Sequence, residues 1–373
     1  MKDISVIIPV YRESKLVPKV LDTLMNQEMD TRKYEVIVVV DEPTKRFLNL
    51  LKKYDRVKVI VNRRRIGKAS ALNKAVENSS GNILLFLDDD IILPNDRHYL
   101  KKIIEEMKDT DILDIRKEVI NTHSLLSRLT YYEYAGFNIS SWFVSKFVRR
   151  HPTINGSAFA IRREVFVTLG GFKRVILEDM DIAARAFFKN YRFKYTKRIS
   201  VYNIVHSKWK NWLVQRKRWS LGCALWWKEW WKDLLKTCAR QPQVFVPGLL
   251  FLSPSIVLFL LHLFIPDVVL CKIFSLIFFL LATKLDIVFP ILWLTVISVD
   301  LVRGLFASMV SFFATSGIFF AFSKKLNFRF KLREFLVYYF FYSLLALIIQ
   351  IVALIIVFLF EERTVGVMSD WKV

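Results

Sequence analysis

Residues 4–13 read ISVIIPVYRE, an apolar, β-branched run that ends in a proline and then in polar side chains. Three more short apolar runs follow in the next eighty residues, and amphipathic stretches such as 17–29 and 69–79 separate them. The four predicted strands are Ile4–Val10, Glu35–Val40, Val57–Val61 and Ile83–Leu87. This alternation of strand and helix predicts an α/β domain with a mostly parallel sheet that is buried on both faces.

Polar side chains follow three of these strands directly. They are Pro9–Glu13 after the first strand, Asp41–Glu42 after the second and Asp88–Asp90 after the fourth. The carboxyl ends of parallel strands meet at one edge of the sheet, where open α/β folds bind their ligands. Neither GxxxxGK[ST] nor GxGxxG occurs in the chain, so a P-loop and a dinucleotide-binding loop are both disfavoured. A phosphate-bearing ligand would have to be held by a metal ion and basic side chains.

The Asp88–Asp90 run is a candidate metal site. Asp88 and Asp90 point to the same side if the strand continues through them, and two carboxylates can bind one Mg²⁺ or Mn²⁺ that bridges to substrate phosphates. The alternative is an acidic turn, and Asp41 has the same alternative as a residue at the end of a strand. The basic loop Asn62–Lys68 could steer an anion or could be a solvated loop.

Two later motifs also have structural explanations of their own. Glu178–Asp181 opens a helix expected at Ile182–Asn190, and acids in a first helical turn are favoured by the helix dipole without any catalytic role. Gln215–Trp219 lies within a Trp-rich, basic stretch, Trp209–Trp231, that is typical of an amphipathic helix at lipid headgroups.

The charge is distributed unevenly along the 373 residues. Residues 1–243 hold 46 of the 56 Lys and Arg and 27 of the 34 Asp and Glu, which is a net charge of +19. Residues 244–373 hold the remaining ten basic and seven acidic residues, a net charge of +3. The three cysteines lack the spacing of a zinc site and are odd in number, so they suggest neither zinc nor a disulfide framework. A reducing, cytoplasmic setting fits the first part best.

The second part predicts a helical membrane domain. Val244–Ile265 and Phe335–Phe360 carry no formal charge and exceed the about 20 residues that a transmembrane helix needs. Three further apolar stretches lie between them: Val268–Thr283, Ile287–Val302 and Gly304–Ser323. Together with the two outer stretches they predict four or five transmembrane spans. Asp300 and Arg303 would share a helix face as a buried pair, or lie in an interfacial loop.

The direction of these spans follows from charge. The loop 324–334 carries five basic residues and is expected on the cytoplasmic side, which places the tail after residue 360 outside. The N-terminal run MKDISVIIPV is too short for a secretory signal and is expected to form a strand.

The order of these motifs is more specific than any one of them. SVIIPVYRE, VVVDE, GKASALN, FLDDD, NGSAFAIRREVF with LGGF, LEDMD and QRKRW together resemble the membrane-bound glycosyltransferases of family 2, which include cellulose, chitin and hyaluronan synthases and glucosylceramide synthase. The resemblance covers about residues 4–231. QRKRW is its most discriminating element, because soluble family 2 enzymes and dolichyl-phosphate mannose synthases usually lack it.

The resemblance implies a donor site at the sheet edge of a GT-A-like, nucleotide-sugar-binding domain. Pro9, Tyr11 and Glu13 would shape the base pocket, and Asp41 would contact the nucleobase or ribose. Lys68 would lie near the diphosphate of the donor. Where relatives have Asp-Asp-Gly-Ser after the second strand, this chain has Asp41 followed by Glu-Pro-Thr, so the loop under the base differs.

The resemblance also implies the chemistry. Asp88 would contact the nucleotide sugar and share a divalent metal, Mg²⁺ or Mn²⁺, with Asp90. Asp179, in the pair with Glu178, would be the general base, because inversion needs a carboxylate that accepts the proton of the attacking hydroxyl. Asp89 replaces a residue that is commonly small and neutral in relatives.

The QRKRW residues complete the implied site. Gln215, Arg218 and Trp219 would line its diphosphate and acceptor end, and Arg216 with Arg218 could place positive charge on the departing diphosphate. Asn155-Gly156-Ser157 matches a glycosylation acceptor, but Gly156 more plausibly allows close backbone approach near the sugar or acceptor.

The expected protein is a membrane-embedded, metal-dependent, inverting glycosyltransferase at the plasma membrane with its catalytic domain in the cytoplasm. The expected parts are a catalytic domain at 1–207, interfacial helices at 208–243, transmembrane helices at 244–360 and a tail at 361–373. A UDP-sugar is the favoured donor and a lipid, lipid-linked glycan or growing polysaccharide the acceptor, with processive synthesis and single transfer both open.

Three other interpretations are weighed against this one. A transporter or receptor with a regulatory nucleotide-binding domain would not need Asp179. An inactive relative that serves as an assembly partner would not need the intact carboxylates. Nucleic-acid binding is disfavoured because anionic lipid headgroups account for the same positive charge.

Overall fold

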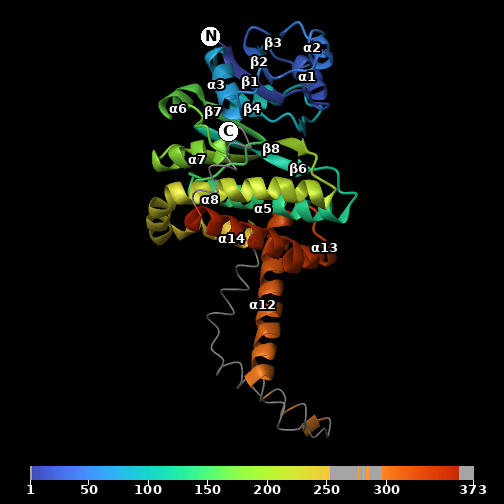
Figure 1. Ribbon diagram of the computed structural model, residues 1–373, viewed down its shortest axis with the longest axis vertical. Helices are drawn as coiled ribbons and strands as arrows, with labels where there is room; N and C mark the ends of the chain where they lie inside the picture. The colour runs from blue at the N-terminus through green and yellow to red at the C-terminus, as the bar shows by residue number, and fades with distance from the viewer. Residues whose placement is uncertain (1, 253–275, 277–279, 281–282, 285–295, 361–373) are drawn as a thin grey trace. The chain divides into compact units, whose positions relative to one another are not determined.

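The computed structural model describes residues 2–252, 276, 280, 283–284 and 296–360 (Figure 1). The chain divides into two compact units. The first, here called the sheet unit, comprises residues 1–248 and 348–373, and the second, here called the helical unit, comprises residues 249–347.

The sheet unit is built on an eight-stranded mixed sheet (Figure 1). Its strands are β1 (Lys2–Tyr11), β2 (Tyr34–Asp41), β3 (Val57–Asn62), β4 (Gly81–Leu87), β5 (Ile91–Ile92), β6 (Ile112–Val119), β7 (Ala158–Arg162) and β8 (Phe193–Asn203). Their order across the sheet is β3-β2-β1-β4-β7-β6-β8-β5. Because β1 pairs in parallel with β2 and β4, and β2 with β3, the carboxyl ends of these four strands share one edge.

Alternate residues of the central strands pack into two cores on opposite faces of the sheet. Val6 and Ile8 of β1 belong to one core and Ile7 to the other. The first core is covered by α1 (Val17–Met25), α2 (Lys45–Leu51) and α4 (Tyr99–Glu106). The second is covered by α3 (Lys68–Glu77), α6 (Arg163–Thr168) and α7 (Glu178–Phe188). The apolar runs of the sequence are continuous because both faces of these strands are buried.

The predicted strands are all present as β1 to β4, and the predicted helices at 17–29 and 69–79 are present as α1 and α3. The prediction of a mostly parallel sheet is correct for β1 to β4 but not for the rest. β7 lies antiparallel to both β4 and β6, and β5 is antiparallel to β8, while β6 and β8 are parallel. The chain still alternates strand and helix in this part, because the 23-residue helix α5 (Leu125–Phe147) separates β6 from β7 and two helices separate β7 from β8. Alternation alone therefore does not determine the direction of a strand.

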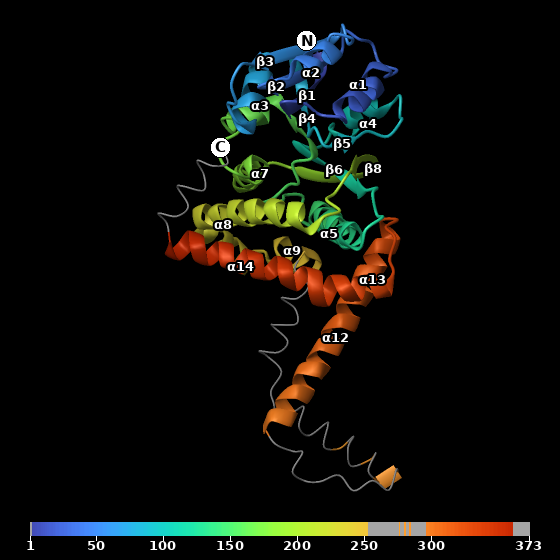
Figure 2. The same cartoon turned by 45° about the vertical axis from the view of Figure 1, so that its right-hand side comes forward.

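Helix α8 (Trp209–Arg240) carries the QRKRW motif and is one continuous helix of 32 residues. It lies beside α5 in both cartoon views (Figures 1 and 2). Trp212 and Trp226 of this helix are buried inside the sheet unit, whereas Trp209 and Trp231 are exposed. Part of the Trp-rich stretch therefore serves protein packing instead of the lipid contact predicted for the whole stretch. A short 3₁₀ turn, η1 (Pro242–Val244), follows the helix.

The remaining helices are α9 (Val246–Leu252), α12 (Val296–Lys325), α13 (Leu332–Val337), the π-helical turn η3 (Tyr338–Tyr342) and α14 (Ser343–Leu359). Within the helical unit, aromatic rings of α12 pack on α13 and η3, as in the Phe319–Phe335 and Phe312–Tyr339 pairs. Of the residues described, one stretch, Leu332–Leu359, is long and apolar enough to cross a membrane, which is weak support for a membrane domain.

Most of the predicted spans cannot be compared with the structure. The predicted span 304–323 lies within α12, and 335–360 lies within the stretch from α13 to α14. The spans predicted at 244–265, 268–283 and 287–302 lie partly or wholly outside the described residues, as do the side chains of Asp300 and Arg303 and the tail from residue 361. Four or five spans therefore stay a prediction.

Candidate active site

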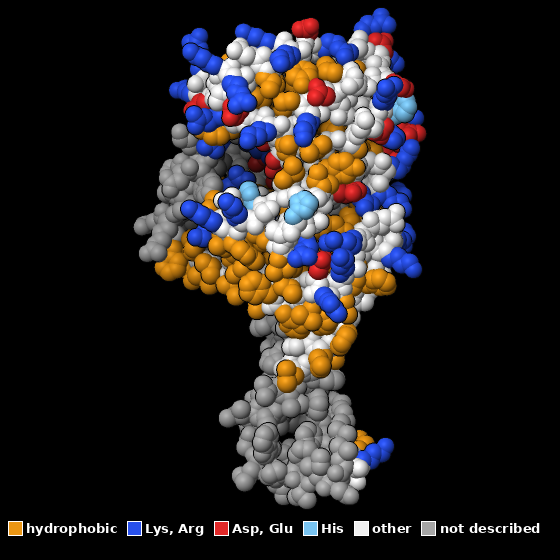
Figure 3. Space-filling model, turned by 90° about the vertical axis from the view of Figure 1, so that its right-hand side faces the viewer, with side chains coloured by type: hydrophobic (Ala, Val, Ile, Leu, Met, Phe, Trp, Pro, Cys, Tyr) orange, Lys and Arg blue, Asp and Glu red, His pale blue; other side chains and the backbone are white. Residues whose placement is uncertain are grey.

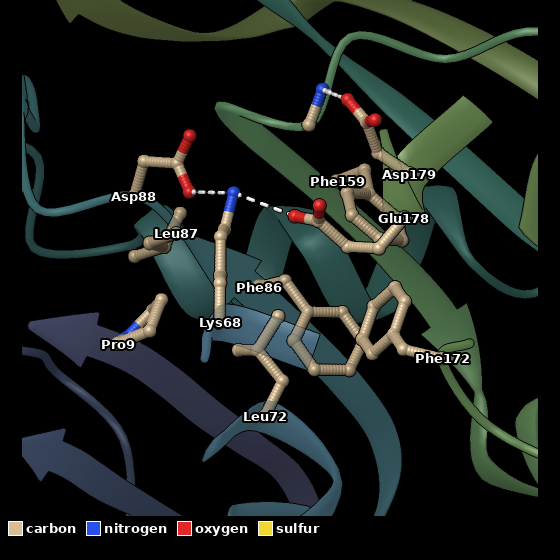
Figure 4. Close-up of a pocket in the computed structure, with 11 residues that line it drawn as sticks. Pro9, Lys68, Leu72, Phe86, Leu87, Asp88, Phe159, Phe172, Glu178 and Asp179 are labelled. Carbon is tan, nitrogen blue, oxygen red and sulfur yellow. Dashed lines mark hydrogen bonds and ion pairs between the residues drawn. The ribbon is translucent and has the colours of Figure 1, made fainter. Parts of the chain in front are cut away.

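The sequence-predicted residues of the first domain gather at the carboxyl edge of β1, β2 and β4. A small cavity there is lined by side chains from five separate elements and loops (Figure 4). Pro9 comes from β1, Lys68 from the start of α3, Asp88 from the end of β4, and Glu178 and Asp179 from the start of α7. β1 and β4 pair in parallel, and α3 and α7 pack in the same core on one face of the sheet. This arrangement brings these residues together.

Asp41 at the end of β2 anchors the loop that leads into α3. Its Oδ1 accepts a hydrogen bond from Asn62 Nδ2 at 2.9 Å, and its Oδ2 accepts from the backbone N–H groups of Ile66 at 3.0 Å and Gly67 at 3.2 Å. Gly67 has a φ of +90°, which only glycine adopts without strain. Asp41 therefore fixes the backbone from which Lys68 projects, whether or not it also touches a nucleotide.

Beside this anchor, the exposed side chain of Tyr11 lies next to Glu42 and Arg65. The Arg65 guanidinium lies 4.5 Å from the centre of the Tyr11 ring, and the Tyr11 hydroxyl donates to Glu42 at 3.3 Å. Glu42 also accepts from the Arg65 backbone N–H at 3.1 Å. Glu13, predicted at the base pocket, accepts from the Thr44 hydroxyl at 2.9 Å. Tyr11 therefore presents an exposed aromatic ring beside charges of both signs.

Lys68 is the cation at the centre of the cavity. Its Nζ lies 2.7 Å from Asp88 Oδ1 and 2.9 Å from Glu178 Oε1, as Figure 4 shows. Desolvation lowers the pKa of Lys68, but the charges of Asp88, Glu178 and Asp179 outweigh it, so the pKa lies well above the usual value. The lysine is therefore fully protonated and joins the metal motif to the Glu-Asp motif.

Asp179 is held by backbone groups on both of its oxygens. Its Oδ2 accepts from the Gly156 N–H at 2.7 Å and its Oδ1 from the Met180 N–H at 2.8 Å. A Cβ on residue 156 would lie 2.4 Å from Asp179 Oδ2, so only glycine fits at this position. Desolvation, and after it the charge of Glu178, raise the pKa of Asp179 to about 6. Gly156 thus approaches the general-base candidate itself.

The three aspartates after β4 differ in their surroundings. The Asp88 N–H donates to Ser157 O at 3.0 Å, and the Ser14 hydroxyl donates to Asp89 O at 2.6 Å, so the turn is tied on both sides. Desolvation and the neighbouring carboxylates raise the pKa of Asp89 to about 7. Asp90 has an exposed side chain, and desolvation by the groups around its carboxyl, followed by the charge of Asp88, raises its pKa to about 6.

Asp88 and Asp90 fit a hard divalent cation by the chemistry of their donors. Asp88 lines the cavity, and Asp90 is close enough for the charge of Asp88 to raise its pKa. Among the described residues there is no group of three or more acidic, His or Cys side chains placed to hold a metal. Mg²⁺ and Mn²⁺ are commonly held by one or two carboxylates together with substrate phosphates, so two aspartates are sufficient.

The QRKRW residues on α8 divide between the interior and the surface. Arg218 is exposed, and its positive charge offsets a small part of the rise that desolvation and Asp88 cause in the pKa of Asp90. Gln215 and Trp219 are half-buried on the same helix. None of Gln215, Arg218 and Trp219 is among the residues that line the cavity.

The sequence predicts Arg216 at the diphosphate, but the structure places it elsewhere. Its guanidinium is buried and forms a two-pronged ion pair with Glu133 of α5, with Nη1 at 2.7 Å from Oε1. The ring of Trp219 lies 4.4 Å from the guanidinium carbon and that of Trp212 at 5.4 Å. A cation that is already paired and enclosed by two indoles holds helices together and does not meet a ligand in this state.

Sequence reasoning missed two buried pairs. Glu133 gave no signal because it lies in the middle of a long helix without a motif. Lys117 pairs with Asp114 on β6, deep enough that desolvation lowers the pKa of Lys117 despite Asp114, Asp179 and Asp88. Residues three apart in a regular strand face opposite sides, so alternation of faces along β6 does not predict this pair. The pairing of β6 with β8 is irregular at this place, with a register shift between Ile115 and Arg116.

Known proteins resemble this chain over the same region. Residues 5–170 match the family described as glycosyl transferase family 2. A probable glycosyltransferase, YdaM from Bacillus subtilis, is 27% identical over 236 residues, which is 59% of this chain and 54% of that protein. The β-monoglucosyldiacylglycerol synthase of Nostoc sp. is 22% identical over 246 residues, 62% of this chain and 51% of that protein. The chain thus spans about half the length of these relatives.

Among solved structures, the mannosyltransferase PcManGT from Pyrobaculum calidifontis in complex with GDP-Man and Mn²⁺ is similar at 22% identity and a TM-score of 0.49. The similarity covers 59% of this chain and 61% of that one. The sequence match, the mixed α/β sheet and the motifs along its edge agree with one another. Residues 5–170 of this chain are therefore similar in sequence to glycosyl transferase family 2.

Proposed function

We propose that the protein is an inverting glycosyltransferase that moves a sugar from a nucleotide diphosphate donor to a hydroxyl of a lipid, lipid-linked glycan or growing polysaccharide. The observation that carries the proposal is the placement of Asp179. This carboxylate is oriented by the Gly156 N–H in the same cavity as Lys68 and Asp88, which come from the donor side of the sheet edge.

Asp179 is the proposed general base. Its two backbone hydrogen bonds fix the carboxylate, so an acceptor hydroxyl has one defined position from which to transfer its proton. A pKa of about 6 makes Asp179 a better proton acceptor than an ordinary aspartate, while it stays ionised near neutral pH. Attack from this side and departure of the diphosphate on the other side produce inversion at the sugar carbon.

Positive charge stabilises the departing diphosphate in this proposal. Lys68 and Arg218 are the side chains placed to supply it, and Asp88 and Asp90 are the residues that would hold a divalent metal. When bound, that metal neutralises charge on the leaving phosphates. Arg216 contributes indirectly in this reading, because its pair with Glu133 holds α8 in place. A UDP-sugar is the proposed donor, with Tyr11 and Asp41 at its base.

The acceptor and the location are proposed from the apolar surface. Exposed apolar side chains, including Ile351, Ile355 and Phe358, line one side of α14, and Figure 3 shows a continuous hydrophobic patch on the face it draws. Such a surface suits contact with lipid at the cytoplasmic side of the plasma membrane, where an amphiphilic acceptor is reached without leaving the bilayer. Single transfer and processive synthesis differ in product size alone and use the same proposed site.

The test is release of nucleoside diphosphate from a panel of UDP- and GDP-sugars by the full chain in lipid, with Mg²⁺ or Mn²⁺ and a membrane lipid extract as the acceptor source. We expect one donor to be preferred and Asp179→Asn to reduce the rate by about 10²- to 10⁴-fold, the usual contribution of a general base. Asp109→Asn, at a surface position outside the cavity, is the matched control and should retain full activity. Equal rates for Asp179→Asn and the wild type would contradict the proposal.

A further inference from the structure

Lys68 holds two groups that the proposed reaction needs to be separate. Its ammonium lies between Asp88 Oδ1 at 2.7 Å and Glu178 Oε1 at 2.9 Å (Figure 4). Asp88 is one of the two carboxylates placed to hold a divalent cation, and Lys68 is a cation placed to meet the donor's diphosphate. In the structure the Lys68 ammonium is engaged with Oδ1 of Asp88, so each ligand has to compete with this contact.

The two sets of contacts exclude one another on electrostatic grounds. A divalent cation that takes Asp88 as a ligand would stand close to the Lys68 ammonium, and like charges at that range repel strongly. A diphosphate that takes Lys68 as a partner removes the ammonium from Asp88. The ligand that relieves the conflict therefore carries phosphate oxygens and the metal together.

We propose that Lys68 is a latch: while the donor site is empty, it occupies the Asp88 carboxylate and disfavours binding of a divalent cation alone, and the diphosphate of the donor draws it away. This inference rests on the proposed function and adds the order in which the site fills. Metal and nucleotide diphosphate then bind with positive coupling, and each improves the affinity of the other by the same factor.

The backbone around the latch is fixed, so the exchange needs only a side chain to move. Asp41 holds the N–H groups of Ile66 and Gly67 just before Lys68, and Ser157 O holds the N–H of Asp88. The lysine has a flexible four-carbon stem, which allows its ammonium to leave Asp88 without a change in α3. Glu178 remains as the second partner that returns the ammonium when the site empties.

The test measures Mn²⁺ binding to the full chain in lipid by the loss of the free-ion electron paramagnetic resonance signal, with and without UDP or GDP. For the wild type we expect the nucleotide to tighten Mn²⁺ binding, roughly 5- to 150-fold if the coupling is of the usual size. For Lys68→Met, which keeps an unbranched side chain one atom shorter and removes the charge, we expect tighter Mn²⁺ binding without nucleotide and a smaller gain when nucleotide is added.

Two further variants separate the latch from a general effect of charge. Lys68→Arg keeps a cation in place and should keep weak binding of Mn²⁺ alone, and Lys52→Met, at an exposed lysine that ends α2, should behave as the wild type does. The proposal is overturned if Lys68→Met binds Mn²⁺ alone no more tightly than the wild type, or if no variant binds Mn²⁺ with any nucleotide. Intact coupling together with no diphosphate release from any donor would contradict the proposed function and leave the latch standing.

Discussion

Glu178 and Asp179 are adjacent in the chain and have different partners. Glu178 contacts the Lys68 ammonium, whereas the oxygens of Asp179 accept backbone N–H groups from Gly156 and Met180. The pair of acids at the start of α7 is thereby divided into one that binds a cation and one that can accept a proton. Two neighbouring carboxylates with separated roles are typical of sites that perform acid–base chemistry.

The pH dependence of the reaction tests this division. Because Asp179 must be ionised to act as a base and its pKa is raised to about 6, kcat/KM should fall as the pH drops through about 6. Glu178→Gln removes the negative charge that helps to raise this pKa, so the acidic limb should move to lower pH. The measurement is diphosphate release between about pH 4.5 and about pH 8, a range that brackets this pKa. A limb that stays in place or moves upward in Glu178→Gln would contradict Asp179 as the base.

The same shift has a defined sign for stability. The pKa of Asp179 in the folded protein is higher than the usual value of 3.8 for an aspartate, so the folded state binds the proton more tightly than the unfolded state does. The contribution of this group to stability is therefore most favourable below the unfolded pKa and decreases as the pH rises through the folded pKa. A base that is poised for catalysis in this way costs the protein some stability at neutral pH.

Among the elements, α8 connects the helices around the site. Arg216 of α8 is paired with Glu133 of α5, and the Trp226 indole N–H donates to Met180 O of α7 at 3.2 Å. Gly222 lets α8 approach Leu177, the residue before the Glu-Asp pair, because a Cβ there would lie 2.7 Å from the Leu177 side chain. The QRKRW helix thus supports the segment that carries the general base.

Breaking the buried pair should destabilise the sheet unit. Arg216→Met leaves the Glu133 carboxylate without its guanidinium in the interior, and removal of one partner of a buried ion pair typically costs about 3–5 kcal/mol. We expect a large fall in the unfolding temperature. Tryptophan fluorescence measures it, because Trp212 and Trp219 lie against the Arg216 guanidinium. The double variant Arg216→Met with Glu133→Leu should recover much of the loss, because no charge is then left buried.

The neighbouring lysine provides the control for this change. Lys217 is exposed on the same helix, so Lys217→Met should leave the unfolding temperature close to that of the wild type. An Arg216→Met protein that is as stable as Lys217→Met would show that the pair does not support α8.

Sequence reasoning found the first half of the fold and the strand-end residues of the cavity for one physical reason, whereas Glu178 and Asp179 were assigned to the site through the family resemblance. Buried parallel strands produce continuous apolar runs, and the polar residues that follow them, such as Asp41 and Asp88, must meet at one edge. The antiparallel β7 and the Arg216–Glu133 pair were not predictable in this way. In both cases the partners are residues far apart in the chain. The sequence has no repeating pattern at these places from which the partner could be predicted.

At the scale of the whole molecule, most of the charged residues and the most apolar helix lie in different parts of the sequence. The first 243 residues carry a net charge of +19, whereas α14 has an almost wholly apolar sequence. One side of α14 is used inside the sheet unit, where Ala353 and Val357 pack on Leu221 and Ala224 of α8. The opposite side, with Ile351 and Ile355 each 45% exposed, has the i, i+4 spacing of a single helix face. Basic protein surface beside an apolar helix face is the combination that binds anionic membranes.

Cysteine labelling tests whether this face of α14 meets lipid. In a chain whose three native cysteines, Cys223, Cys238 and Cys271, are changed to Ser, we place one cysteine at a time by Ile355→Cys or Lys232→Cys. Both side chains are exposed in the structure, so they would react alike with a membrane-impermeant maleimide if both faced water. In inside-out membrane vesicles we expect Lys232→Cys to be labelled rapidly and Ile355→Cys to be protected until detergent is added, because acyl chains exclude the charged reagent.

Ala353→Cys, buried against α8, should stay unlabelled until the protein is unfolded, which separates burial in protein from burial in lipid. Labelling of Ile355→Cys at the rate of Lys232→Cys in intact vesicles would place this face of α14 in water and remove the apolar surface as support for a lipid-side acceptor.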